Sequence, residues 1–270
     1  MLQMIQQGVL LIGTLAGAVT DAKTGYIYDW ITYPMILLGL LLSIAQGQWV
    51  NIGLAGILFI TSYLAYRFGK IGGGDVKIFA GIALLNPYND INFLMTIAIM
   101  SASGAMMFYS TYYIIKYVRK GIKIEDNKKG IMHSAIIFVS LVAYLVILGD
   151  IGLLNSGMMM FVGIPFCFGL VFMAFQKGIR KNFFEESITL KQWEEDEVIA
   201  EEANTKKVLR LLRGKTLITK KEILLLKKEG VLRIVVLRNL PKFGPFIFIG
   251  TLIAVLWPNF ISIIMPIAGI

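Results

Sequence analysis

Cysteine, histidine and charge are all scarce in this sequence. There is a single cysteine, Cys167, and a single histidine, His133, among 270 residues. One cysteine excludes an internal disulfide and any CxxC zinc site, and one histidine argues against a histidine-based metal cluster. Only 16% of the residues are charged, whereas a soluble globular protein is typically about 25% charged because its surface faces water. We therefore expect neither a cytosolic enzyme, a disulfide-linked secreted domain nor a disordered chain, and we expect no metal or organic cofactor.

Long apolar runs dominate instead. Hydrophobic residues make up 57% of the chain, and the mean hydropathy is +0.72. A helix that crosses a bilayer needs about 20 apolar residues, and most of the runs approach this length. The sequence predicts an all-α membrane helix bundle with about eight transmembrane helices in contact with the lipid bilayer. The runs lie near residues 5–20, 31–46, 50–66, 76–86, 91–115, 131–149, 151–175 and 243–266.

The basic residues predict how this bundle is oriented. All 26 Lys and Arg residues fall in or beside four segments, 21–30, 67–75, 116–130 and 176–242. Basic residues concentrate in the cytoplasmic loops of membrane proteins, so these segments are predicted to be cytoplasmic and both termini to lie outside. The net charge of +9 is then a topology signal, and no nucleic-acid partner is expected.

Three parts of the chain are expected. Residues 1–175 would form a transmembrane core of seven helices, residues 176–242 a cytoplasmic insertion, and residues 243–270 the last transmembrane helix. Thr219 and Glu222 have the spacing of a capping box, so a helix should begin there. The insertion is therefore predicted to be a small helical subdomain.

Two carboxylates lie at the ends of apolar runs, where a charge is costly and usually functional. Asp21 ends the first run, and Asp75 opens the fourth. From Asp75 to Asn86 the fourth run gives ~18 Å of helix against ~30 Å of hydrocarbon, so Asp75 would lie inside the membrane. Both carboxylates should face the cytoplasmic side. A close carboxyl pair can share one proton and activate water, as in an aspartyl protease.

The residues around Asp75 refine this hypothesis. Gly72, Gly73 and Gly74 precede it, and three glycines disfavour helix, allow positive φ and permit close approach of another backbone. Asp75 would sit at a helix N-terminus, where the dipole favours the ionised carboxylate and makes it a candidate base. Lys77 points about 200° away from Asp75 on a helix. Lys77 could therefore belong to the functional motif or could simply extend its ammonium group to the membrane interface, and we give the two interpretations equal weight.

The sequence contexts of the two aspartates resemble a known family. Residues 21–34, DAKTGYIYDWITYP, resemble the segment that begins at the first catalytic aspartate of type IV prepilin peptidases, and residues 72–81, GGGDVKIFAG, resemble their second motif, G-x-G-D-x-K-x-x-A. The resemblance covers about residues 8–110. Residues 216–256 resemble, more loosely, the C-terminal part of archaeal prepilin and preflagellin peptidases.

This resemblance implies a GxGD aspartic endopeptidase of the cell membrane. It would cleave the short basic leader of prepilin-like or preflagellin precursors on the cytoplasmic side. Asp21 and Asp75 would be the catalytic pair, and Gly72, Gly74 and Lys77 the motif residues around the substrate. Bacterial members often carry two CxxC pairs and N-methylate the new terminus, so the single cysteine argues against methyltransferase activity and favours an archaeal-type peptidase. The tripeptide at 27–29, Ile-Tyr-Asp, lacks the proline of the bacterial pattern.

Other classes of protein fit less well. A presenilin-like protease shares GxGD, but Pro-Ala-Leu occurs nowhere in the sequence. A rhomboid-like serine protease would need Ser103 and His133, and small residues such as Ser103 usually mean close helix packing. An ion-coupled transporter would use membrane carboxylates, but no inverted repeat is evident. The acidic stretch 185–202 is more often a solvated surface, and the alternative is that it attracts a basic leader peptide.

Overall fold

Helices form most of the structure. A computed structural model of the chain describes residues 1–69, 71–152, 154–193 and 197–261. Each of the eight apolar runs contains a helix in these residues, and five of the helices are long and apolar enough to cross a membrane. The chain is a multi-pass membrane protein with an all-α bundle, as predicted. The five long helices are α1 (Leu2–Thr24), α3 (Trp49–Arg67), α5 (Ile91–Lys120), α6 (Ile124–Asp150) and α7 (Ser156–Phe183), and the shorter ones are α2 (Asp29–Ala45), α4 (Gly73–Leu84) and α10 (Gly244–Leu256).

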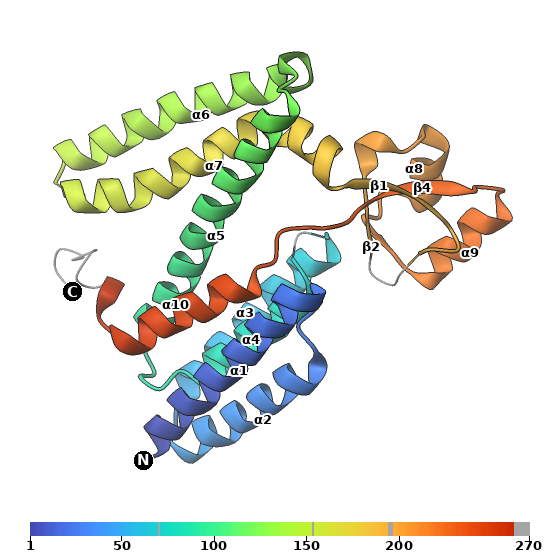
Figure 1. Cartoon of the computed structure of the whole chain (residues 1–270). Coiled ribbons are helices and arrows are strands. Elements are labelled where there is room, and N and C mark those ends of the chain that lie inside the picture. Colours follow the sequence, from blue (N-terminus) through green and yellow to red (C-terminus); the bar gives the residue numbers. More distant parts are fainter. Residues whose placement is uncertain (70, 153, 194–196, 262–270) are drawn as a thin grey trace.

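The first four helices and α10 form one packed group (Figure 1). In it α1 packs against α2 and α10, while α4 lies against α2 and α3. Fully buried side chains such as Leu10, Ile78 and Ile247 join these helices in one apolar core. Helix α5 connects the group to the α6–α7 hairpin, because it packs against both α10 and α7.

The predicted last helix is interrupted after Leu256. The apolar run extends to residue 266, but α10 ends at Leu256. Trp257 precedes Pro258, and a residue before proline is disfavoured in the helical conformation. Residues 262–266 of the predicted helix lie outside the described residues. At the other boundary, α7 continues past residue 175 to Phe183.

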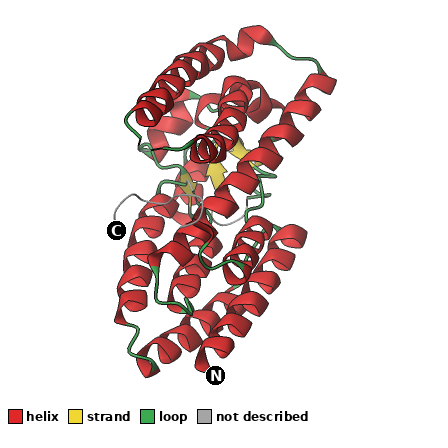
Figure 2. Cartoon of the chain, turned by 90° about the vertical axis from the view of Figure 1, so that its left-hand side faces the viewer, coloured by secondary structure: helices red, strands yellow, loops and turns green. Residues whose placement is uncertain are grey.

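The insertion after α7 is not purely helical, which corrects the prediction. It contains a four-stranded antiparallel sheet in the order β1-β4-β2-β3, and the strands lie together among the helices in Figure 2. In β4 the alternating residues Ile234 and Val236 are buried, the pattern of a strand with one covered face. The strands are β1 (Glu185–Thr189), β2 (Glu197–Ile199), β3 (Leu217–Ile218) and β4 (Arg233–Leu237), and the helices are α8 (Lys206–Leu212) and α9 (Lys220–Lys228).

The predicted start of α9 is confirmed. Thr219 and Glu222 form the capping box, and Glu222 also pairs with Lys215 at 2.5 Å. Burial raises the pKa of Glu222, but the hydrogen bonds from Lys215 and Thr219 outweigh it and lower that pKa to about 2. Glu222 is therefore ionised at neutral pH and ties the first turn of α9 to Lys215 and Thr219.

A short segment joins this sheet to the membrane bundle. Residues 238–243, which we name the strap, run from the end of β4 to the start of α10. Arg238 at its beginning binds Glu197 of β2 at 2.5 Å and the carbonyl of Gln192 at 2.8 Å. The strap therefore starts from a fixed point on the sheet and ends beside the helices that carry the two aspartates.

Candidate active site

Asp21 lies in the last turns of α1 and is 6% exposed. Its Oδ2 accepts a hydrogen bond of 2.7 Å from the backbone N–H of Gly244, and the backbone of Phe243 adds a second hydrogen bond. Gly244 is the first residue of α10, so its N–H has no partner within the helix. The Asp21 carboxyl thus occupies the positive end of α10.

Asp75 lies in the first turn of α4 and is half-buried. The backbone N–H of Gly72, the residue before the helix, donates a hydrogen bond to the Asp75 carboxyl, as an acidic side chain at the third helical position commonly accepts. Asp21 is close enough for the charges of the two carboxyls to interact. The two aspartates that the sequence singles out therefore lie within range of each other's charge.

The motif glycines neither adopt positive φ nor interrupt the helix, in contrast to the sequence expectation. None of Gly72, Gly73 and Gly74 has a positive φ, and the last two are the first residues of α4 rather than a break in it. The close approach is real at Gly74, where a β-carbon would lie 2.8 Å from Cβ of Ile27 and 2.9 Å from its carbonyl oxygen. Ile27 follows α1 in the chain, so Gly74 allows the loop after Asp21 to pack directly on the helix of Asp75.

Lys77 is held on the far side of α4 from Asp75. Its ammonium group binds the Asp29 carboxylate at the start of α2 and lies 5.0 Å from the ring centroid of Tyr33. Asp29 is the last residue of the 27–29 tripeptide, so this ion pair ties the first motif to the second. Lys77 and Gly74 thus join the loop after Asp21 to α4 at two points.

Three residues near Asp21 escape the sequence analysis. The hydroxyl of Tyr109 on α5 accepts a hydrogen bond of 2.9 Å from the N–H of Lys242 and donates one of 2.7 Å to its carbonyl. The ammonium group of Lys242 binds the carbonyl of Ala22 at 2.7 Å. Together with Gly244 they hold the strap against α1. The only signal in the sequence is the Pro-Lys-Phe-Gly-Pro segment at 241–245, which marks a helix entry and says nothing about its partner.

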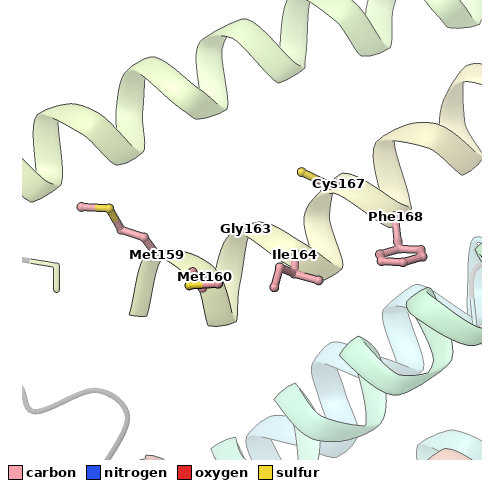
Figure 3. A pocket seen from close by; sticks show the side chains of 6 residues that line it. All are labelled: Met159, Met160, Gly163, Ile164, Cys167 and Phe168. Carbon is pink, nitrogen blue, oxygen red and sulfur yellow. The ribbon is translucent and has the colours of Figure 1, made fainter. Parts of the chain in front are cut away.

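Other parts of the described structure offer less chemistry. An apolar hollow lies along α7, and Figure 3 shows its lining, Met159, Met160, Gly163, Ile164, Cys167 and Phe168. The side chains of this lining are apolar apart from the thiol of Cys167. Among the described residues, no group of three or more His, Cys, Asp or Glu side chains is arranged to hold a metal ion.

Comparison with known proteins agrees with the two motifs. The family model described as "Type IV leader peptidase family" matches residues 8–110, which confirms the predicted resemblance over that part of the chain. A curated relative, Prepilin peptidase EppA of Methanothermobacter thermautotrophicus, is 31% identical over 96 residues, which are 32% of this chain and 25% of the relative. The match thus spans about a quarter of the length of that relative. No solved structure matches the chain.

Proposed function

We propose that this protein is a membrane aspartic endopeptidase. It cleaves the short basic leader of prepilin-like or preflagellin precursors at the cytoplasmic face, ahead of their hydrophobic helix. The observation that supports this proposal is that Asp21 and Asp75 lie within range of each other's charge at one end of the bundle, inside the region that matches the leader peptidase family. Lys23 and Arg67 lie in the last turns of α1 and α3, so the same end is basic and is assigned to the cytoplasm.

In the proposed reaction the two carboxyls have different roles. Asp21 accepts two backbone hydrogen bonds and lies near the charge of Lys242, whereas Asp75 accepts one from Gly72. Hydrogen bonds and positive charge favour the ionised form of a carboxyl. We therefore assign Asp21 as the base and Asp75 as the protonated partner, the reverse of the assignment that the sequence favours.

The chemistry then needs only water and the peptide. Asp21 takes a proton from water as the water oxygen attacks the scissile carbonyl, and Asp75 donates its proton to the carbonyl oxygen. When the tetrahedral intermediate collapses, the C–N bond breaks and the leaving amine takes the proton held by Asp21. One of the two hydroxyls of the intermediate returns its proton to Asp75. This leaves a carboxylic acid as the product and restores the starting pair.

The acidic stretch 185–202 is the alternative contact for a basic leader. Three of its carboxylates are already paired: Glu185 with Arg180, and Glu186 and Glu197 with Arg238. The acidic residues 194–196 lie outside the described residues, while Glu201 and Glu202 are exposed. If these two attract the leader, changing both to Gln raises KM and weakens its dependence on salt. An unchanged KM at all salt concentrations removes this role for Glu201 and Glu202.

A substrate panel tests the function itself. Purified protein in lipid is mixed with tagged prepilin-like and preflagellin precursors, and mass spectrometry identifies the new N-terminus. The proposal predicts one cut ahead of the hydrophobic segment and no methylation of the new terminus. A cut inside the hydrophobic segment would instead indicate a presenilin-like protease, and intact precursors throughout would contradict a leader peptidase.

A further inference from the structure

The strap contacts three helices near the two aspartates, α1, α4 and α5. Lys242 binds Ala22 of α1 and the Tyr109 hydroxyl of α5, as described above. The ring of Phe243 lies 6.3 Å from that of Phe79 on α4. At the other end of the strap, the Tyr113 hydroxyl reaches the carbonyl of Asn239 at 3.5 Å. The strap thus follows one face of α5 until it meets α1 and α4.

Tyr109 is the most specific of these contacts. One hydroxyl group both accepts from and donates to the backbone of Lys242, two residues before the N–H that binds Asp21. The ring is fixed independently, with centroids 6.0 Å from Tyr113 and 5.5 Å from Phe246. A side chain locked by its neighbours can hold a second group in place within a few tenths of an ångström.

Gly244 packs so closely against Asp21 that no side chain larger than hydrogen fits between them. A β-carbon at this position would lie 2.8 Å from Cβ of Asp21 and 2.9 Å from its Oδ2. The φ of Gly244 is not positive, so the missing side chain serves close approach and not an unusual backbone conformation. The strap is therefore seated directly on the carboxyl that it hydrogen-bonds.

We propose that Tyr109 is a positioning residue, which holds the strap so that the Gly244 N–H orients the Asp21 carboxyl toward Asp75. This inference rests on the proposed peptidase function and adds a specific requirement to it. Tyr109 touches neither the reacting peptide nor the water in this role, and it acts only through the backbone of Lys242 and Gly244. Removing its hydroxyl leaves the aromatic contacts in place but takes away both hydrogen bonds to the backbone of Lys242.

The test compares Tyr109→Phe with Tyr112→Phe. Tyr112 lies on the same helix, and its ring packs against those of Phe108 and Tyr113, so it controls for the general loss of a hydroxyl from α5. Misplacing a catalytic group by about 1 Å can cost about 100-fold in rate. With part of the docking retained, Tyr109→Phe should lower kcat about tenfold and leave KM within about twofold, while Tyr112→Phe keeps wild-type kinetics.

A second readout does not depend on activity. Hydrogen exchange followed by mass spectrometry on peptides covering residues 238–244 should be faster in Tyr109→Phe than in the wild type or in Tyr112→Phe. Unchanged kcat, a change confined to KM, or unchanged exchange in the strap would each overturn the inference. If the wild-type protein cleaves no precursor, the peptidase proposal fails, and the exchange rates still decide whether Tyr109 holds the strap.

Discussion

Replacing Gly74 by alanine should show whether the glycine motif is needed for close packing, because the same change at Gly73 alters helix propensity without a clash. In the first turn of α4, Gly73 and Gly74 are adjacent and both have negative φ. A β-carbon at Gly73 would lie 3.4 Å from the Tyr66 ring, which is an ordinary contact. A β-carbon at Gly74 would instead meet Cβ and the carbonyl oxygen of Ile27 at 2.8 and 2.9 Å. The second contact involves backbone, which cannot move aside as a flexible side chain can.

The magnitude follows from comparing Gly74→Ala with Gly73→Ala. Replacing glycine by alanine in a helix contributes up to about 1 kcal/mol of stability, and this gain applies to both variants. Overpacking a well-packed core costs about 1–3 kcal/mol, and only Gly74→Ala incurs it. We therefore expect Gly73→Ala to match or exceed the wild type in stability and Gly74→Ala to fall about 1–3 kcal/mol below Gly73→Ala.

The assay is thermal unfolding of both variants in the same lipid, followed by precursor cleavage. Displacing Ile27 moves the loop after Asp21 away from the helix of Asp75, so Gly74→Ala should also lose most of its activity. Equal unfolding temperatures and equal activities for the two variants would refute the reasoning, because the clash would then be absorbed without cost.

The remaining predictions concern Lys77, the insertion and the orientation. The Lys77 side chain is 28% exposed, and exposed ion pairs contribute about 0–1 kcal/mol to stability. Lys77→Met should therefore leave the unfolding temperature nearly unchanged, and a fall of many degrees would contradict this. A raised KM would support a substrate contact. The pKa of Glu222 lies below its ordinary value, so its stabilisation is present above about pH 4.5 and is lost as the pH falls toward about 2. Glu222→Gln should therefore lower the local free energy of unfolding of α9 by about 2 kcal/mol at pH 7, which is measured as faster hydrogen exchange. Near pH 2 the substitution should have little effect, and equal effects at both pH values would be inconsistent with this. In a Cys167→Ser background, an impermeant thiol reagent should label Ala45→Cys from outside intact cells and Lys221→Cys only after the membrane is opened, and the reverse pattern would invert the proposed topology.

The membrane bundle was predictable because its signal is long and repeated. Each apolar run forms a helix, and the polar residues between runs mark the turns. The strands of the insertion were not predictable in the same way. In β1 only Ile188 is fully buried, and β3 is two residues long, so no alternating pattern extends far enough to be read. Helix α10 ends before Pro258 although the apolar residues continue beyond it, because hydropathy alone does not register the break at proline.

Part of the candidate site could likewise be predicted from the sequence, and part could not. Asp21 and Asp75 stand out because charge is rare in apolar surroundings and because short motifs surround them. The partner of Asp21 is a backbone N–H that lies 223 residues away, and a backbone group has no identity in a sequence. Tyr109 resembles any aromatic residue on a membrane helix until the strap is seen beside it. The glycine motif was recognised, but its purpose depends on where Ile27 packs, which is a property of the tertiary structure.

The most direct test of the central claim is a double-mutant cycle on the two aspartates. Cleavage rates are measured for Asp21→Asn, Asp75→Asn and the double variant, with folding checked for each by thermal unfolding. Because residues that act as a unit are strongly non-additive, the account predicts that each single variant is as inactive as the double variant. A well-folded single variant that keeps a rate within about tenfold of the wild type would contradict a catalytic pair.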